Sequence, residues 1–253
     1  HNEQKSNLAI LDKPKSIIAE TFRSLRSNLQ YFSSEKELQT ILVTSGSSGE
    51  GKSFCSTNLA SIMAISGKKT ILLGLDLRKP KLFDDFGLTN DIGVSNYLGG
   101  FVEMEGIIIK TEFNNLDVVF GGPVPPNPAE LLMGNKMDKL MSFLKSEYEI
   151  IIIDTPPIGI VSDTFNLLKY ADISLYLVRH LYTQQDSLKP LNEYREKGII
   201  KNMALILNDF KARTGYGYGY NYGYGYGYGY GYGYGYGSQY EESNEKKKPF
   251  SKK

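Results

Sequence analysis

Hydrophobic residues in the first 213 positions form short runs that are separated by polar and turn-forming segments. Several runs are unbroken stretches of Ile, Leu and Val rather than alternations with polar residues. Unbroken runs are typical of strands buried on both faces, as in a parallel sheet. We therefore predict six strands, in the segments TILVTS (40–45), KTILLGLD (69–76), LDVVFGG (116–122), YEIIIID (148–154), DISLYLV (172–178) and MALILN (203–208).

Helical periodicity occurs before and between these runs. Apolar positions in residues 14–32 recur every three or four residues, which predicts an amphipathic helix with Pro14 at its start. Four further helices are expected at about 52–65, 128–147, 162–170 and 184–197. Because strands alternate with helices, we predict a doubly wound α/β fold with a mainly parallel sheet flanked by helices. The first helix is expected to bury one stripe of residues: Ile18, Phe22, Leu25, Leu29 and Phe32.

The composition changes abruptly after Arg213. From Tyr216 to Tyr236 every second residue is tyrosine, and most of the residues between are glycine. Glycine at alternate positions makes a strand costly in conformational entropy and leaves one face without side chains. We predict an N-terminal extension or tag remnant at 1–13, a folded domain at 14–213 and a flexible tail at 214–253. The tail holds twelve tyrosines: Tyr216, Tyr218, Tyr220, Tyr222, Tyr224, Tyr226, Tyr228, Tyr230, Tyr232, Tyr234, Tyr236 and Tyr240.

Charge and composition exclude several classes of protein. The formal net charge of +1 provides no overall basic or acidic field, which argues against nucleic acid as a partner. Cys55 is the single cysteine, so a disulfide framework is excluded and a reducing compartment is indicated. The apolar runs are too short to cross a bilayer. Because the chain begins with His1 rather than Met, we expect a tag remnant or a fragment, and an upstream membrane segment stays open.

The segment GSSGEGKS at 46–53 fits the phosphate-binding pattern G-x-x-x-x-G-K-[ST]. It follows a predicted strand and opens a predicted helix, which is the context in which such a loop binds nucleotide phosphates and defines a P-loop NTPase-like fold. Lys52 is expected to contact the β- and γ-phosphates of ATP, and Ser53 to bind Mg²⁺. A simple connecting loop is the weaker alternative. The predicted ATP- or ADP-binding residues are Gly46, Ser47, Ser48, Gly49, Glu50, Gly51, Lys52, Ser53 and Phe54.

Two aspartates end predicted strands and are candidate metal ligands. Asp154 ends EIIIID, a pattern in which a buried strand delivers one carboxylate to a nucleotide site, and Asp76 ends ILLGLD. In an open parallel sheet both strand ends lie at the edge where the phosphate loop sits. Each aspartate could instead cap the turn that follows it, and this alternative is stronger for Asp76.

These motifs occur together with PPNPAELL, the segment ETFRSLR and the terminal tyrosines, and together they closely resemble the bacterial tyrosine kinases over about residues 14–240. These kinases are the cytoplasmic modules of polysaccharide co-polymerases, which control capsule and exopolysaccharide export. The resemblance implies that Lys52, Ser53, Asp76 and Asp154 hold Mg·ATP, with Lys52 and the two aspartates catalytic. It also implies that a neighbouring subunit phosphorylates the tail tyrosines.

The resemblance further implies a ring homo-oligomer, octameric in the family, whose subunits contact one another through Glu20, Arg23 and Arg26. On a helical wheel these three residues lie off the apolar stripe, although spacing alone favours a solvated Glu20–Arg23 pair. The expected location is the cytoplasmic side of the bacterial plasma membrane. The expected partners are a transmembrane co-polymerase segment or activator and an opposing tyrosine phosphatase.

One position departs from the family pattern. The second acidic motif usually reads D-x-D-x-R, whereas here Gly74 replaces the first aspartate and Asp76 is retained. Asp76 could serve as metal ligand and proton acceptor together, since phosphoryl transfer depends mainly on positioning and charge. A nucleotide-binding assembly module without kinase activity therefore stays an alternative. A switch ATPase of the plasmid-partition type is a third hypothesis, but TSGSSGEGKS lacks the additional lysine of that class.

Overall fold

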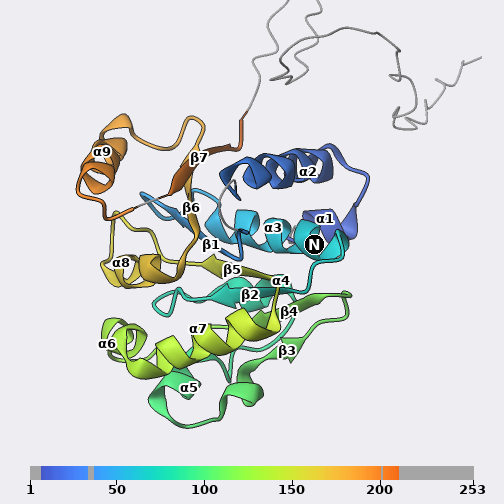
Figure 1. Cartoon of the computed structure of the whole chain (residues 1–253), viewed down its shortest axis with the longest axis vertical. Coiled ribbons are helices and arrows are strands. Elements are labelled where there is room, and N and C mark those ends of the chain that lie inside the picture. Colours follow the sequence, from blue (N-terminus) through green and yellow to red (C-terminus); the bar gives the residue numbers. More distant parts are fainter. Residues whose placement is uncertain (1–6, 34–36, 201, 211–253) are drawn as a thin grey trace, which may run out of the picture. The chain divides into compact units, whose positions relative to one another are not determined.

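All six predicted runs form strands, and these strands pair into one sheet. The structure is a computed structural model that describes residues 7–33, 37–200 and 202–210. The strands are β1 (Thr40–Ser45), β2 (Thr70–Gly74), β3 (Ile109–Lys110), β4 (Leu116–Val119), β5 (Ile150–Asp154), β6 (Ile173–Arg179) and β7 (Met203–Asn208). Their order is β3-β4-β2-β5-β1-β6-β7, and only the β3–β4 pair is antiparallel (Figure 1). The predicted fold class is confirmed, while β3, with two residues, is too short for a sequence pattern. The tail predicted at 214–253 and its tyrosines lie outside the described residues.

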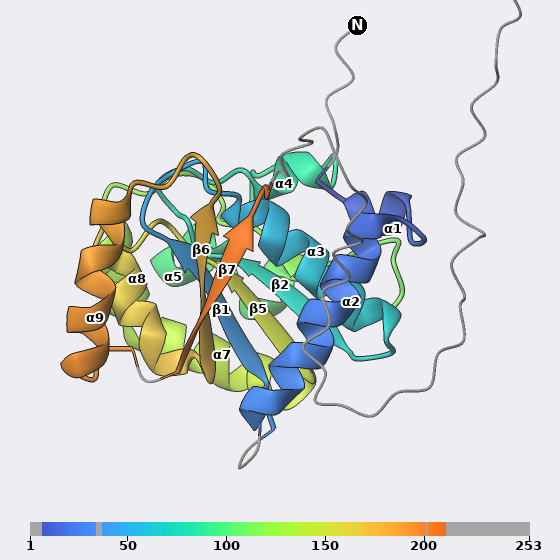
Figure 2. The same ribbon diagram turned by 90° about the horizontal axis from the view of Figure 1, so that it is seen from above.

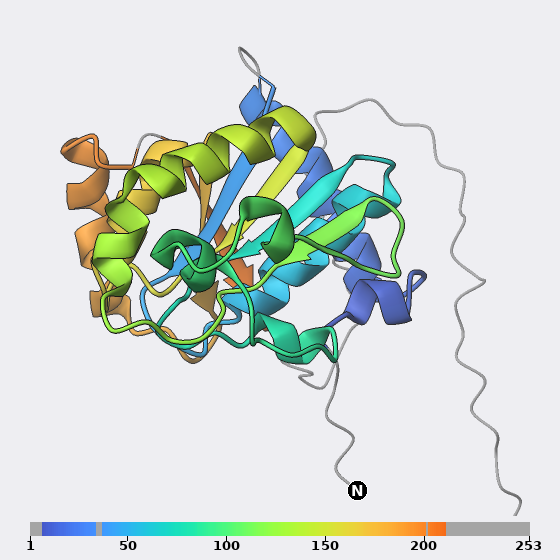
Figure 3. The ribbon, with the colours of Figure 1, turned by 90° about the horizontal axis from the view of Figure 1, so that it is seen from below.

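Helices cover both faces of the sheet (Figures 1 and 2). One face carries α1 (Ala9–Asp12), α2 (Ile17–Leu29) and α3 (Lys52–Ile65). Figure 3 shows the opposite face, with α7 in yellow-green and α5 in green. The remaining helices are α4 (Leu82–Asp85), α5 (Val94–Gly99), α6 (Pro128–Met133), α7 (Asn135–Glu147), α8 (Asp163–Leu167) and α9 (Lys189–Glu196), with 3₁₀ turns at Gln30–Ser33, Met104–Ile107, Leu168–Tyr170 and Gln185–Leu188.

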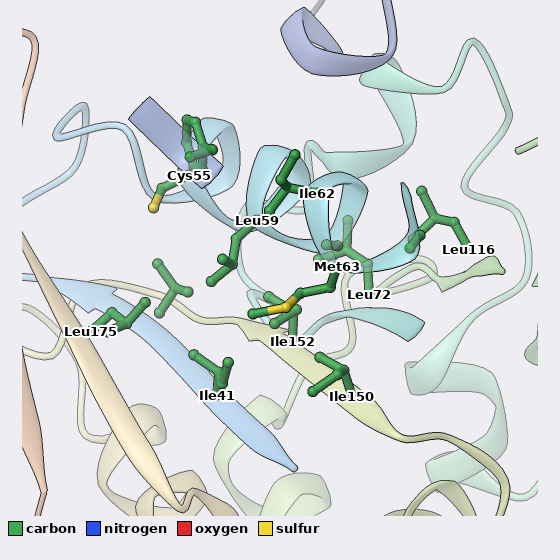
Figure 4. Packing of buried hydrophobic residues seen from close by; sticks show 14 of the residues in the cluster. Ile41, Cys55, Leu59, Ile62, Met63, Leu72, Leu116, Ile150, Ile152 and Leu175 are labelled. Atoms are coloured by element: carbon green, nitrogen blue, oxygen red, sulfur yellow. The ribbon is translucent and has the colours of Figure 1, made fainter. Parts of the chain in front are cut away.

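The two faces of the sheet bury separate hydrophobic clusters. Ile41 and Ile152 face α3, whereas Leu42, Ile151 and Ile153 face the α5 and α7 side. Figure 4 shows Ile41 and Ile152 beneath residues of α3 such as Leu59. Successive strand residues point to opposite faces, so a strand covered on both sides must be apolar at every position. This packing explains the unbroken apolar runs in the sequence.

The first predicted helix is real but is shifted and less buried than expected. It begins at Ile17, because the Ser16 hydroxyl caps it by accepting a hydrogen bond from the Ala19 N–H at 3.2 Å. Pro14 therefore precedes the helix. Phe22 and Leu29 are buried as predicted, but the outer residues of the stripe, Ile18 and Phe32, are 43% and 51% exposed. The prediction was wrong at these two positions, since neighbouring elements leave Ile18 at the start of α2 partly uncovered and Phe32 lies beyond α2 in the turn Gln30–Ser33.

The helix predicted at 52–65 is confirmed with the same bounds as α3, whereas the other three predicted helices are interrupted or trimmed at their ends. The 128–147 segment divides at Gly134, whose extended backbone separates α6 from α7. Asn127 occupies the cap position of α6 with Pro128 next, although its side chain makes no capping hydrogen bond. The 184–197 and 162–170 segments each combine a 3₁₀ turn with an α-helix.

The described part of the N-terminal extension packs against the same core as the rest of the domain. Ile10 in α1 is fully buried in the cluster on the α3 face. The Ile10 N–H donates to Asn58 Oδ1 at 3.0 Å, and Asn58 Nδ2 donates to the Asn7 carbonyl at 2.6 Å. These contacts fasten residues 7–12 to the helix that follows the phosphate loop.

Candidate active site

The predicted phosphate loop joins β1, an inner strand between β5 and β6, to the N-terminus of α3. Gly49 and Gly51 have φ values of +83° and +96°, which residues with a side chain rarely adopt. A Cβ on Gly51 would also lie 2.1 Å from Asn208 Nδ2, so only glycine fits there. The loop therefore has the tight backbone that phosphate binding at a helix N-terminus requires.

Side chains from β6, β7 and the segment after β6 donate hydrogen bonds to carbonyl groups of the loop. Tyr182 donates to the Ser48 carbonyl at 3.0 Å, Arg179 to the Gly49 carbonyl at 2.8 Å, and Asn208 to the Glu50 carbonyl at 2.9 Å. Because each peptide unit directs its N–H opposite to its carbonyl, these contacts turn loop N–H groups toward the interior of the loop.

Glu50 has a structural role that its place in the motif did not indicate. Its side chain is fully buried, accepts from the Ser47 N–H at 2.7 Å and receives a second hydrogen bond from the Thr183 hydroxyl. The carboxylate thus ties the start of the loop to its middle and to the segment after β6. Within the predicted nucleotide-binding set, Glu50 would contribute through its backbone rather than through its charge.

Lys52 and Asp154 are both buried near the phosphate loop, and each influences the charge of the other. The Lys52 ammonium donates to Ser45 Oγ at 3.3 Å, and burial lowers the pKa of Lys52 while the nearby carboxylates of Asp154, Asp76 and Glu50 oppose that shift. Burial raises the pKa of Asp154 to about 6, and its hydrogen bond from Ser53 and the Lys52 charge act in the opposite direction. In this buried pair, each charge therefore favours the ionised form of the other residue.

Two hydroxyl groups bind the Asp154 carboxylate. Ser53 Oγ donates to Oδ2 at 2.8 Å, and Ser56 Oγ donates to Oδ1 at 3.0 Å. Sequence reasoning missed Ser56, although a signal was present. It lies three residues after Ser53 on the same helix, and residues at that spacing share a helix face.

Asp76 lies two residues beyond β2, which ends at Gly74, and so it does not end the strand itself. Its Oδ1 accepts hydrogen bonds from the backbone N–H groups of Arg78 and Lys79, at 3.3 and 3.0 Å. Asp76 therefore caps the turn that follows it through Oδ1, and its second oxygen is left for other partners. Gly74 pairs directly with Asp154 across the sheet, so the missing aspartate of the family pattern would stand beside Asp154.

These residues surround one cleft of about 440 Å³ at the carboxyl edge of the sheet. Its wall contains part of the phosphate loop, Asp76, Asp154 and the segment Arg78–Phe83, whereas the predicted residues Gly46, Ser47 and Glu50 do not line it. Arg78 also forms a bidentate pair with the buried Asp163, at 2.7 and 3.0 Å, which fixes that segment. The sequence-predicted residues that line the cleft are Ser48, Gly49, Gly51, Lys52, Ser53, Phe54, Asp76 and Asp154.

The donor set suits a magnesium ion that arrives with a nucleotide. Within the described residues no group of three or more His, Cys, Asp or Glu side chains could hold a metal by itself. A serine hydroxyl and a buried carboxylate at one edge match the usual binding of Mg²⁺, which keeps waters and takes phosphate oxygens as further ligands. Ser53 and Asp154 therefore fit the ion, with Asp76 near enough to influence the charges of both Lys52 and Asp154.

The proposed oligomer contacts lie outside the cleft wall. Glu20 and Arg23 on α2 form an ion pair within the chain, and Arg23 also donates to the Pro14 carbonyl at 2.7 Å. Arg26 donates to the Ile62 carbonyl of α3 at 3.4 Å. The structure therefore places these three residues on α2, apart from the residues that converge on the phosphate loop.

Comparison with known proteins places this site in a family. Residues 41–219 match the CobQ/CobB/MinD/ParA nucleotide binding domain. Tyrosine-protein kinase YwqD of Bacillus subtilis is 34% identical over 210 residues, which cover 83% of this chain and 89% of that protein. The chain belongs to the bacterial tyrosine kinases. The kinase domain of Escherichia coli tyrosine kinase ETK has a TM-score of 0.77 to this structure at 31% identity, with 88% of each chain covered.

Other relatives define how far the similarity extends. The chimerical protein CapA2B2 has a TM-score of 0.74 at 36% identity, covering 79% of this kinase and 89% of that chain. Against the tyrosine-protein kinase wzc of Salmonella typhi, the match spans 84% of this chain but 30% of the longer protein. The cell division ATPase MinD of Pyrococcus furiosus, at 22% identity and a TM-score of 0.56, shares the fold alone. The family membership thus favours the tyrosine kinase over the switch ATPase hypothesis.

Proposed function

We propose that this kinase transfers the γ-phosphoryl group of ATP to tyrosines in the tail of a neighbouring copy. One observation carries the proposal: the phosphate loop, Lys52, the Ser53–Asp154 pair and Asp76 share one cleft. A chain of this family that also carries twelve tail tyrosines combines a site for the phosphate donor, ATP, with phosphate acceptors. The tail itself lies outside the described residues.

The cleft residues have separate tasks in this reaction. Lys52 neutralises charge on the β- and γ-phosphates, and the loop N–H groups hold the phosphates in place. The bond between the γ-phosphorus and the β–γ bridging oxygen breaks as a bond to the tyrosine oxygen forms, and Asp76 takes the phenolic proton. Ser53 and Asp154 would hold Mg²⁺, which would supply further charge neutralisation on the phosphates.

Incubation of the purified full chain with Mg·ATP tests the proposal. We expect phosphotyrosine at several tail positions, mapped by mass spectrometry after digestion. A protein that hydrolyses ATP without forming phosphotyrosine would support a switch ATPase, and one that binds ATP without either reaction would support an assembly module. Mixing an inactive chain with an isotope-labelled active chain shows whether transfer occurs between copies.

Restoring the family's first aspartate tests the Gly74 departure. A Cβ at position 74 would lie 3.3 Å from the end of the flexible Leu82 side chain, which can shift, and 3.5 Å from the Val119 carbonyl. Because the new carboxylate would stand beside Asp154, we expect Gly74→Asp to lower the Mg²⁺ concentration that gives half the maximal rate. An unchanged magnesium dependence would place position 74 outside the field of the metal. If the unaltered chain forms no phosphotyrosine and Gly74→Asp does, the glycine at position 74 accounts for the missing kinase activity.

We also propose a closed ring with contacts through Glu20, Arg23 and Arg26, since head-to-tail contacts close when the rotation permits. Alanine at all three positions is expected to give monomers that still bind nucleotide. The loss of an exposed intrachain pair costs the fold about 1 kcal/mol or less. Light scattering at several concentrations, with and without Mg·ATP, measures the mass.

The matched control for the ring carries the same change of charge elsewhere. Glu105, Lys110 and Lys139 are exposed residues that do not line the cleft, and their replacement by alanine should leave the oligomer intact. A native protein that remains monomeric at high concentration in both nucleotide states would rule out the ring while leaving the kinase assignment unaffected.

The cellular role follows from relatives. One relative is named the putative tyrosine-protein kinase in the cps region of Klebsiella pneumoniae, and another is CapB of Staphylococcus aureus. We propose that this kinase regulates capsule or exopolysaccharide polymerisation at the cytoplasmic face of the membrane. A membrane activator, fused or separate, and a tyrosine phosphatase would be its partners. Among the described residues no helix is both long and apolar enough for a membrane span.

A further inference from the structure

Two lysines at the rim of the cleft have no role in the chemistry derived above. Lys79 and Lys81 are exposed, and both line the cleft that contains Lys52 and Asp76. In the part of the chain that the structure describes, no hydrogen bond or ion pair is found for either ammonium group. Arg78, between them and the strand, is instead engaged with Asp163. The rim therefore presents two positive charges that are available to a ligand.

The position of Lys79 relates these charges to the acceptor tyrosine. Its backbone N–H lies 3.0 Å from Asp76 Oδ1, so its side chain starts beside the carboxylate that we assign to the phenolic proton. A flexible four-carbon stem then carries the ammonium away from that point. A negative group a short distance along the acceptor peptide from the reacting tyrosine would fall within its reach.

Around the tyrosines from Tyr216 to Tyr236 the acceptor sequence contains no such negative group until it is phosphorylated, whereas Tyr240 is followed by Glu241 and Glu242. From Gly215 to Gly237 it holds no Asp or Glu, and tyrosine recurs at every second position. In an extended peptide, residues two apart are separated by about 6.7 Å and project to the same side. The first anion that could follow or precede the reacting tyrosine is therefore a phosphotyrosine, which carries about −1.5 to −2 charges.

We propose that Lys79 and Lys81 form a subsite for a phosphotyrosine two residues from the acceptor, so that each transfer favours the next. The inference rests on the proposed function, because it requires tyrosine peptides to enter this cleft. Two lysines offset the charge of about one phosphotyrosine. Phosphates beyond the first would stay uncompensated by this pair, and a heavily loaded segment would leave the cleft.

The test compares two synthetic peptides as substrates of the full chain. One is Gly-Tyr-Gly-pTyr-Gly, and the other has phenylalanine in place of the phosphotyrosine, so each offers a single acceptor. A second pair with the order reversed covers both directions along the peptide. We expect kcat/KM to be about fivefold higher for the phosphorylated peptide of at least one pair, as for a pair of partly exposed ionic contacts.

Variants then assign the preference to the two lysines. Lys79→Ala/Lys81→Ala should lower the ratio of the two kcat/KM values to about one, because only the phosphorylated peptide loses a contact. Lys79→Arg/Lys81→Arg should preserve the ratio, and Lys139→Ala, an exposed lysine on α7, should leave it unchanged.

Several outcomes would overturn the subsite. One is a ratio of the two kcat/KM values equal to one in the unaltered protein for both peptide pairs. Another is a raised ratio that persists in the double alanine variant. A rise in the KM for ATP that is equal for both peptides would assign the lysines to the nucleotide. If neither peptide is phosphorylated while the chain also fails to form phosphotyrosine on itself, the proposed function fails first.

Discussion

Replacing Lys52 by methionine is expected to lower the rate of tyrosine phosphorylation by about 10²- to 10³-fold. The methionine side chain fills a similar volume, so the substitution opens no cavity. It removes the positive charge that would neutralise the β- and γ-phosphates. Lys52 is nearly fully buried beside Asp154, and the substitution also leaves that carboxylate without its cation. The rate is measured as phosphotyrosine formed on the full chain at saturating Mg·ATP.

Two controls separate a catalytic loss from unfolding. Lys139→Met changes an exposed lysine on α7 to the same residue and should leave the rate unaltered. Without nucleotide, Lys52→Met should unfold cooperatively at a lower midpoint, because Asp154 loses its nearby cation, and it should remain folded at the assay temperature. Undiminished phosphotyrosine in Lys52→Met would mean that another site, or a contaminating kinase, carries the activity.

Asp76→Asn is expected to lower the transfer rate by about 10²-fold or more, because general-base catalysis of this kind contributes about 10²- to 10⁴-fold. The amide oxygen of asparagine can still accept the hydrogen bonds from Arg78 and Lys79, so the turn is kept while the charge and the basicity are lost. Single-turnover rates at saturating Mg·ATP measure the chemical step.

The affinity for Mg·ATP distinguishes the two roles assigned to Asp76. If the residue also assists the metal, Asp76→Asn will bind a fluorescent ATP analogue more weakly in Mg²⁺, and the difference will disappear in EDTA. Asp91→Asn, at an exposed position that does not line the cleft, is the matched control. Normal turnover in Asp76→Asn would show that Asp76 is neither base nor ligand, and that its carboxylate only caps the turn.

The helix α2 shows how far a local pattern determines a helix. The pattern fixed the existence of the helix, and it correctly predicted Phe22 and Leu29 as buried. It did not predict that Ile18 would be 43% exposed. Periodicity records which residues share a face, whereas burial depends on how much of that face a neighbouring element covers. Only the packing of α2 on α3 decided this.

The sequence by itself located the residues at the centre of the candidate site. The phosphate loop, Lys52, Ser53 and Asp154 could be found because glycine spacing, one strand and one helix start specify them over short stretches. Unbroken apolar runs likewise determined a sheet covered on both faces, since alternating runs would have indicated one exposed face.

The tertiary structure decided what surrounds that centre. Asn208 reaches the Glu50 carbonyl across 158 residues of sequence, and Arg179 reaches Gly49 across 130. These contacts depend on β6 and β7 lying beside β1, and the strand order is set by the packing of the whole sheet rather than by any local pattern. The same is true of Lys79 and Lys81, which only the folded chain brings to the rim of the nucleotide cleft.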